Sequence, residues 1–121
     1  MPVRSLNSSV LKWPDQATVV SRVKAWAAAA GSSRPEAIRI GYFGSLARSD
    51  WGVGSDVDLV ILVAATDQPF ERRAIAWDTT ELPVPADVLV YTMAEWEAMA
   101  EGSRFPRWVN EDLRWIYDRN S

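Results

Sequence analysis

The sequence predicts an α/β domain of the α+β kind, with a small mixed sheet flanked by helices. Segments with helical and strand periodicity alternate in the order helix, strand, helix, strand, helix, strand, helix, short helix and strand. The stretch from Leu59 to Val63 is apolar on both faces, which is typical of a strand covered on both sides. A chain of 121 residues has room for one core and little more. We therefore expect a single domain over residues 1–121 in which helices pack on a sheet.

The first half of the chain predicts a long helix followed by a strand. Asp15 suits the N-cap position, apolar residues then recur at helical spacing, and Gly31 is the expected end of the helix. The preceding stretch, Arg4 to Trp13, is too mixed to assign. Alternating apolar and polar residues predict a strand over 38–43.

Gly44 and Ser45 follow that strand directly and predict a turn. A helix beginning near Leu46 would direct its free backbone N–H groups back toward this pair. Such a helix start is a ready site for an anion such as a phosphate. The loop over 49–54 then leads into the apolar strand that opens near Asp56.

The second half predicts three helices and two strands. A helix is expected after Thr66 and Asp67, with Pro69 in its first turn. Its apolar stripe consists of Phe70, Ala74 and Trp77. Thr92 and Glu95 have the spacing of a capping box, which predicts a helix start. The remaining expected elements are a second buried strand over 86–91, a helix over 94–101, a short helix over 106–111 and an edge strand over 113–117.

The composition excludes several kinds of chemistry. The chain has no Cys and no His, so disulfides, Cys/His zinc sites, Ser-His-Asp triads and cysteine nucleophiles are ruled out. The net charge of −3 argues against direct binding of nucleic acid, which needs clustered Lys and Arg. No apolar run approaches the ~20 residues of a membrane span, and the N-terminus lacks the apolar region of a signal peptide. We expect a cytoplasmic protein without a membrane partner.

Three aspartates stand at strand starts and form the candidate metal site. Asp56 and Asp58 are two residues apart, so on a strand they share a face. Asp87 opens the next strand, and all three carboxylates would lie on one rim if the two strands are neighbours. Like charges at the edge of a core repel each other, and Mg²⁺ is the natural cation for such oxygen ligands. Taken singly, each aspartate also fits a solvated strand end, and the Gly-Ser pair fits an ordinary turn.

Together these residues resemble the signature of the DNA polymerase β-like nucleotidyltransferase superfamily. More narrowly, the chain is similar to the minimal nucleotidyltransferase (MNT) proteins of bacteria and archaea, and the resemblance covers most of its length. Asp87, on a later strand, matches the third carboxylate of that signature. The residues that carry the resemblance are Gly44-Ser45-x-Ala47-Arg48, six further residues, and Ser55-Asp56-x-Asp58-Leu59.

The resemblance implies a role for each motif residue. Gly44 and Ser45 would contact the β- and γ-phosphates of a nucleoside triphosphate. Asp56 and Asp58 would ligate Mg²⁺. Asp87 would complete a second metal site and help to deprotonate the acceptor hydroxyl.

The resemblance also concerns three further positions, Ser55, Arg48 and Ser49. Ser55 would cap the turn into the strand beside the phosphate site. Arg48 would either contact phosphate or form a structural ion pair, and we favour the structural role. The family commonly has Gly after the motif Arg, whereas this chain has Ser49, which would restrict the loop if that position needs φ > 0.

The implied function is transfer of a nucleoside monophosphate, AMP from ATP, onto a hydroxyl acceptor. MNT proteins of this size resemble the antitoxin halves of toxin-antitoxin pairs whose partners are HEPN-domain ribonucleases, so a separate HEPN-type partner protein is the expected acceptor. The alternative is an MNT-like binding module that neutralises such a partner by contact alone. Oligomeric state stays open.

Two other enzyme classes fit less well. Nucleotidylation of small molecules, as in aminoglycoside modification, would normally need an added helical domain. Phosphatases of the haloacid-dehalogenase type also use an Asp-x-Asp pair, but theirs follows an apolar strand. Here the pair precedes one.

Overall fold

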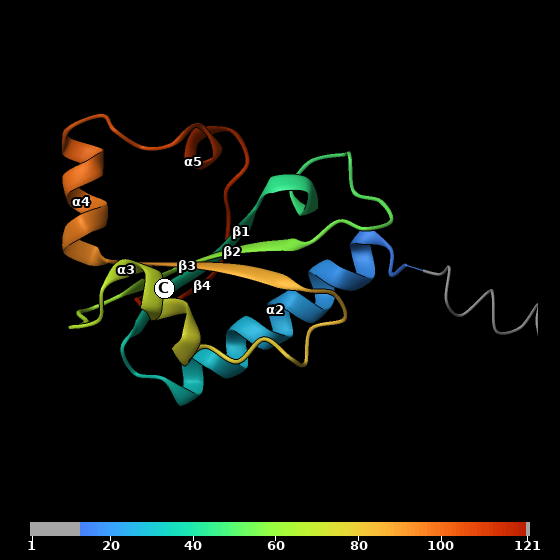
Figure 1. Ribbon diagram of the computed structural model, residues 1–121, viewed down its shortest axis with the longest axis horizontal. Helices are drawn as coiled ribbons and strands as arrows, with labels where there is room; N and C mark the ends of the chain where they lie inside the picture. The colour runs from blue at the N-terminus through green and yellow to red at the C-terminus, as the bar shows by residue number, and fades with distance from the viewer. Residues whose placement is uncertain (1–12, 121) are drawn as a thin grey trace, which may run out of the picture.

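A four-stranded mixed sheet forms the centre of the computed structural model, which describes residues 13–120 (Figure 1). The strand order is β3-β2-β1-β4, in which β2 pairs parallel with β3 and antiparallel with β1, and β4 pairs antiparallel with β1. This confirms the expected fold class. The unassigned stretch before Trp13 lies outside the described residues. The strands are β1 (Ala37–Phe43), β2 (Val57–Val63), β3 (Ala86–Thr92) and β4 (Arg114–Asp118).

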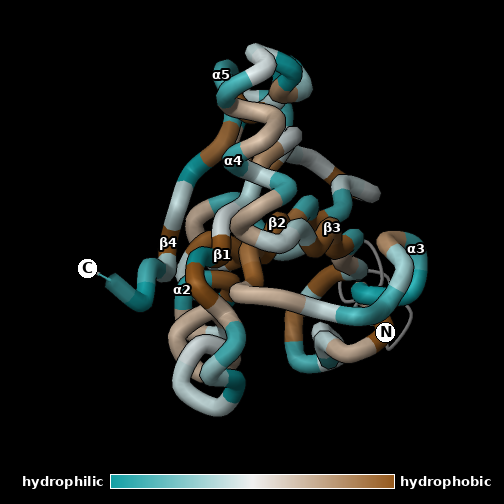
Figure 2. Tube along the Cα trace, turned by 90° about the vertical axis from the view of Figure 1, so that its left-hand side faces the viewer, coloured by the Kyte–Doolittle hydropathy of each residue, from teal (hydrophilic) through white to brown (hydrophobic). Residues whose placement is uncertain are grey.

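Strand β2 is covered on both faces, as its apolar sequence predicts. Leu59 and Ile61 are fully buried on the face that packs against the long N-terminal helix. Val60 and Leu62 point to the other face, where they pack against Trp96. The hydrophobic strands lie between the two helical layers (Figure 2). Asp58 shares the face of Val60 and Leu62, because alternate residues of a strand point the same way.

Strand β3 is an edge strand, which corrects the expectation of a second buried strand. Val90 is its only fully buried residue, and Asp87 is exposed. No further strand pairs with its outer side within residues 13–120. The apolar residues of β3 instead pack on both sides of the sheet. Val88 and Val90 join the core on the side of α2, and Tyr91 contacts Phe70 and Trp96.

Helix α2 (Gln16–Ser33) covers one face of the sheet, and the Asp15 side chain caps its start by accepting the Thr18 N–H at 2.8 Å. The helix does not end at Gly31, as we had expected, but continues to Ser33. A Cβ at Gly31 would collide with the ring of Tyr117 on β4. This glycine therefore permits close packing of helix on sheet and is not a stop signal.

The opposite face carries helices α4 (Met93–Glu101) and α5 (Arg107–Glu111), which lie above the sheet while α2 lies below it (Figure 1). The expected capping box is present at the start of α4: Thr92 Oγ1 accepts the Glu95 N–H, and Glu95 accepts the Thr92 N–H. Trp96 is the buried centre of an aromatic cluster under both helices.

The helix expected after Pro69 is only partly formed. A single turn, α3 (Phe70–Arg73), passes into the 3-10 turn η2 (Ala74–Ala76). The predicted apolar stripe is broken, because Phe70 is 42% exposed while Trp77 has an extended backbone and enters the core between α2 and the sheet. Within the described part of the chain, no helix has the length and apolarity to cross a membrane.

Candidate active site

The two strands that carry the predicted carboxylates are parallel neighbours. Their register places Asp58 directly opposite Asp87, on strands that lie about 4.8 Å apart. Asp56 comes just before β2 and lines the same pocket as the other two. The sheet thus brings all three aspartates to one rim, at the points where β2 and β3 begin.

The Gly44 and Ser45 turn lies against this rim, because Phe43 at the end of β1 pairs with Asp58. Gly44 to Leu46 form one 3-10 turn, η1, and no longer helix starts at Leu46. The expected helix N-terminus is therefore wrong, and what the turn offers is its own short backbone segment. Gly44 has φ +74°, and a Cβ there would collide with Asp58 Oδ2. Glycine is required for the turn to approach the carboxylate this closely.

An open pocket of about 430 Å³ joins these groups. Four of its lining residues are aspartates and two are aromatic. The lining residues are Phe43, Gly44, Ser45, Arg48, Asp56, Asp58, Asp87, Trp108 and Asp112. Of the predicted site residues only Ser55 is absent from the lining. Its Oγ accepts the Gly52 N–H at 3.1 Å, as expected of a residue that caps the turn.

Arg48 forms two ion pairs inside the chain. Its Nη1 lies 2.8 Å from Asp112 Oδ2, and its Nη2 lies 3.3 Å from Asp50 Oδ2. The Asp112 side chain is only 9% exposed, so the first pair is the more sheltered one. The structural role favoured for Arg48 is therefore present, while contact with a phosphate stays a prediction.

The carboxylate cluster carries an excess of negative charge that a bound cation would neutralise. Burial raises the pKa of Asp58, and the neighbouring charges of Asp87 and Asp56 raise it further, against a smaller opposing effect of Arg48. Oxygen ligands of this kind suit Mg²⁺. No group of three potential ligands within residues 13–120 already stands in an arrangement that holds a metal ion. The donor chemistry therefore fits Mg²⁺, and these side chains would have to draw together around it.

Ser49 does not strain the motif loop. The only non-glycine residue between 13 and 120 with positive φ is Ser103, so the Ser49 position has ordinary backbone geometry. The left-handed positions near the site are Gly44 and Gly54. Ser49 in place of the family's glycine therefore imposes no backbone strain on the loop.

Three pocket residues were not predicted from the sequence. Phe43 stacks on Trp108 with ring centroids 3.8 Å apart and planes at 15°, and Asp112 holds Arg48. The strand pattern ending at Phe43 offered a signal for that residue, since it adjoins the Gly-Ser turn. Nothing local marks Trp108 or Asp112, which reach the site from α5 and the residue after it.

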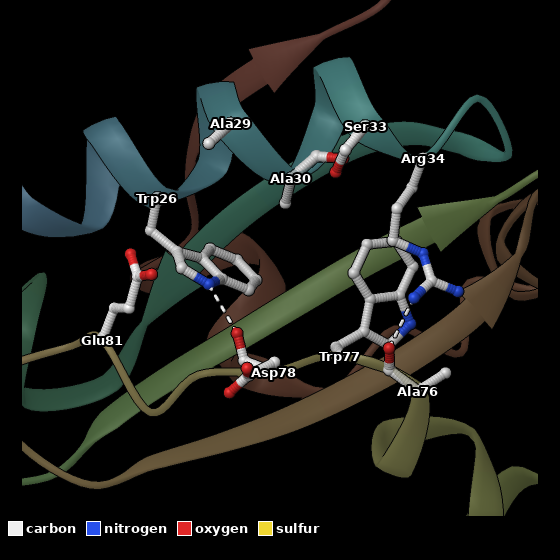
Figure 3. A pocket seen from close by; sticks show the side chains of 9 residues that line it. All are labelled: Trp26, Ala29, Ala30, Ser33, Arg34, Ala76, Trp77, Asp78 and Glu81. Carbon is white, nitrogen blue, oxygen red and sulfur yellow. Dashed lines mark hydrogen bonds between the residues drawn. The ribbon is translucent and has the colours of Figure 1, made fainter.

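A second pocket, of about 370 Å³, lies between α2 and the segment after η2 (Figure 3). Two of its long polar side chains already have partners within the chain. Trp26 Nε1 donates to the Asp78 carbonyl at 2.8 Å. The Arg34 guanidinium lies over Trp77, 4.2 Å from the ring centroid, and donates to the Ala76 carbonyl (Figure 3). Two acidic residues, Asp78 and Glu81, line this pocket, against four aspartates in the first.

Comparison with known proteins supports the family that the motif resembles and the fold. A model of the nucleotidyltransferase domain family matches residues 29–112. The fold is similar to that of a Sulfolobus solfataricus protein, solved at 1.40 Å and described provisionally as a nucleotidyltransferase. The TM-score is 0.63 at 19% identity, over 88% of this chain and 86% of that one. A search of curated proteins gave no match. Because the family model spans most of the chain and contains all three aspartates, the protein belongs to the nucleotidyltransferase domain family.

Proposed function

We propose that this protein is a Mg²⁺-dependent nucleotidyltransferase that moves AMP from ATP onto a hydroxyl group. The observation that carries the proposal is the register of β2 and β3, which sets Asp58 opposite Asp87 beside the Gly44 turn. A rim of carboxylates next to a close backbone turn is the arrangement that a metal-bound triphosphate needs.

In the proposed reaction, the acceptor hydroxyl oxygen forms a bond to the α-phosphorus of ATP. The bond from that phosphorus to the oxygen bridging to the β-phosphate breaks, and pyrophosphate leaves with the bonding electrons. The acceptor proton passes to a carboxylate, and the exposed Asp87 is best placed to take it from an incoming group.

Each remaining residue of the site has a binding or positioning task. Asp56 and Asp58 would hold Mg²⁺, with Asp87 contributing to a second ion. When bound, Mg²⁺ neutralises phosphate charge and favours displacement at phosphorus. Gly44 and Ser45 would hold the β- and γ-phosphates through the turn.

We further propose that the acceptor belongs to a separate protein, as in the MNT and HEPN pairs that the motif resembles. The helices and strands between residues 13 and 120 belong to one sheet and its two helical layers, and none of them forms a separate acceptor-binding unit. The pocket is open to solvent on the side of Asp87, so a side chain of a partner can enter it.

The test uses ATP labelled at either the α- or the γ-phosphate, with the protein encoded by the neighbouring gene as acceptor. We expect the α-label, and not the γ-label, on the acceptor, with none for Asp58→Asn. Transfer of the γ-label would make the protein a kinase and would overturn the proposal. A stable complex with no label from either ATP would favour the alternative, a binding module that acts by contact alone.

A further inference from the structure

We propose that the stacked rings of Phe43 and Trp108 form the nucleobase subsite of the pocket, with Trp108 as the main determinant of nucleotide affinity. This inference rests on the proposed function, because it assigns the part of the nucleotide that the carboxylates do not contact. It names a residue outside the predicted motif.

The residues that line the pocket form two chemically different sets. Seven of its nine lining residues are glycine, serine, arginine or aspartate, and the other two are Phe43 and Trp108. A nucleoside triphosphate is divided in the same way, into an anionic phosphate chain and a flat aromatic base. Aromatic rings bind bases by stacking, which does not depend on the identity of the base.

The two aromatic residues of the pocket lie next to the phosphate turn. Phe43 immediately precedes Gly44 and pairs with Asp58 across the sheet. Trp108 lies on Phe43 in a stack with centroids 3.8 Å apart. A ligand whose phosphates lie along Gly44 and the carboxylates therefore has these two rings as its only aromatic neighbours in the pocket.

Trp108 is held in place from three sides. Its ring stacks on Phe43 and lies 6.5 Å, centroid to centroid, from the buried Trp96. Its carbonyl accepts the N–H groups of Asp112 and Leu113 at 2.9 and 3.0 Å. Asp112 is in turn held by Arg48 of the motif.

Partial exposure separates this stack from the rest of the aromatic cluster. Trp96 is 8% exposed and is core, whereas Phe43 and Trp108 are both half-buried and line the pocket. Trp115 is also half-buried, but it packs on Trp96 and lies outside the pocket lining. It is therefore a matched control for loss of a tryptophan from the same cluster.

The experiment compares binding of Mg·ATP with binding of Mg·tripolyphosphate, which lacks the base and ribose, by calorimetry. Trp108→Leu keeps an apolar side chain for packing but removes the ring. We expect this variant to bind Mg·ATP roughly ten-fold or more weakly than the wild type, with unchanged affinity for Mg·tripolyphosphate. Trp108→Phe should recover most of the loss, and Trp115→Leu, which removes a ring outside the pocket, should bind both ligands as the wild type does.

Two results would overturn the nucleobase subsite. One is unchanged ATP affinity in Trp108→Leu, which would leave Trp108 to packing or to the acceptor. The other is an equal loss for both ligands, which would place the effect on the phosphate site or on folding. If the wild type binds neither ligand in the presence of Mg²⁺, the proposed function itself fails, and the two failures are thereby distinguished.

Discussion

Gly44 and Gly54 provide a matched pair for testing how closely the phosphate turn approaches Asp58. Both have left-handed backbone, with φ of +74° and +86°. A Cβ at Gly44 would collide with the Asp58 carboxylate, whereas nothing lies within 4 Å of a Cβ at Gly54. Each alanine variant therefore carries the same backbone strain, of about 1–2 kcal/mol. Only Gly44→Ala also displaces a proposed metal ligand.

We expect Gly44→Ala to bind Mg·ATP at least about ten-fold more weakly, which is the scale seen when the surroundings that orient a metal ligand are disturbed. Gly54→Ala should lose the stability that its backbone strain costs, with little change in ATP affinity. Thermal unfolding and calorimetry on both variants check this. Equal ATP affinity in the two variants would show that the contact with Asp58 has no bearing on nucleotide binding.

The ionised Asp58 side chain is predicted to lower the free energy of unfolding of this protein. Burial, Asp87 and Asp56 raise its pKa above the 3.8 of a free carboxyl, so ionised Asp58 disfavours the folded state. The stability contributed by this group is full below pH 3.8 and falls as the pH rises through the higher folded-state value. Asp58→Asn should therefore melt at a higher temperature than the wild type at pH 7 and lose nucleotide transfer.

Melting curves from pH 3 to 8 test the sign of this effect. The advantage of Asp58→Asn should be absent at the acid end and should appear as the wild-type carboxyl ionises. Added Mg·ATP should raise the melting temperature of the wild type and not of the variant, because only the wild type retains the ligand. A variant less stable than the wild type at pH 7 would contradict the account.

At the scale of elements, the contact between α2 and β4 depends on Gly31. Alanine has the better helix propensity by about 1 kcal/mol, so an exposed glycine in this helix would gain from the change. Here the methyl group would meet the Tyr117 ring, and overpacking costs roughly 1–3 kcal/mol. We expect Gly31→Ala to lower the urea midpoint, and Ser32→Ala, at an exposed position of the same helix, to leave it unchanged or raise it.

The start of α4 is fixed by an ion pair with α3. Glu95 accepts from Arg73 at 2.7 and 3.0 Å, and this bonding, with a smaller contribution from Thr92, lowers the pKa of Glu95 to about 2. Arg73 is 9% exposed. Glu95→Gln can keep the capping box but leaves this arginine without its counter-charge. Because the Glu95 side chain is 43% exposed and solvent screens the pair, we expect the variant to lose about 1 kcal/mol of unfolding free energy at neutral pH.

The pH dependence of that loss follows from the lowered pKa. The Glu95 contribution is full above the unfolded value of 4.5 and disappears as the pH falls toward 2. Denaturant unfolding of the wild type and Glu95→Gln should therefore differ at pH 7 and converge near pH 2. Glu97→Gln, at an exposed position of α4, is the control and should track the wild type at both.

Elements with local signals could be predicted from the sequence. The four strands, the Asp15 cap and the Thr92 capping box all depend on residues a few positions apart. Two of the predictions that failed concern places where distant contacts decide the structure. Gly31 looked like a helix end because Tyr117 lies far along the chain. The helix after Pro69 stops early, and Trp77 continues extended into the core.

At the scale of the whole molecule, the topology turns scattered aspartates into one site. The motif marked Asp56, Asp58 and Asp87, but only the parallel pairing of β2 with β3 sets Asp58 and Asp87 opposite each other. The aromatic half of the pocket could not be predicted. Trp108 contacts Phe43, and Asp112 contacts Arg48 from 64 residues further along the chain. No local sequence pattern indicates contacts between residues so far apart.

Isothermal titration calorimetry with ATP, in Mg²⁺ and in EDTA, tests the central claim most directly. That claim is that Asp56, Asp58 and Asp87 form a magnesium-dependent nucleotide site. We predict that the wild type binds ATP with Mg²⁺ and not in EDTA, and that Asp58→Asn binds in neither. Equal binding of ATP with and without Mg²⁺, or equal binding by the wild type and Asp58→Asn, would contradict it.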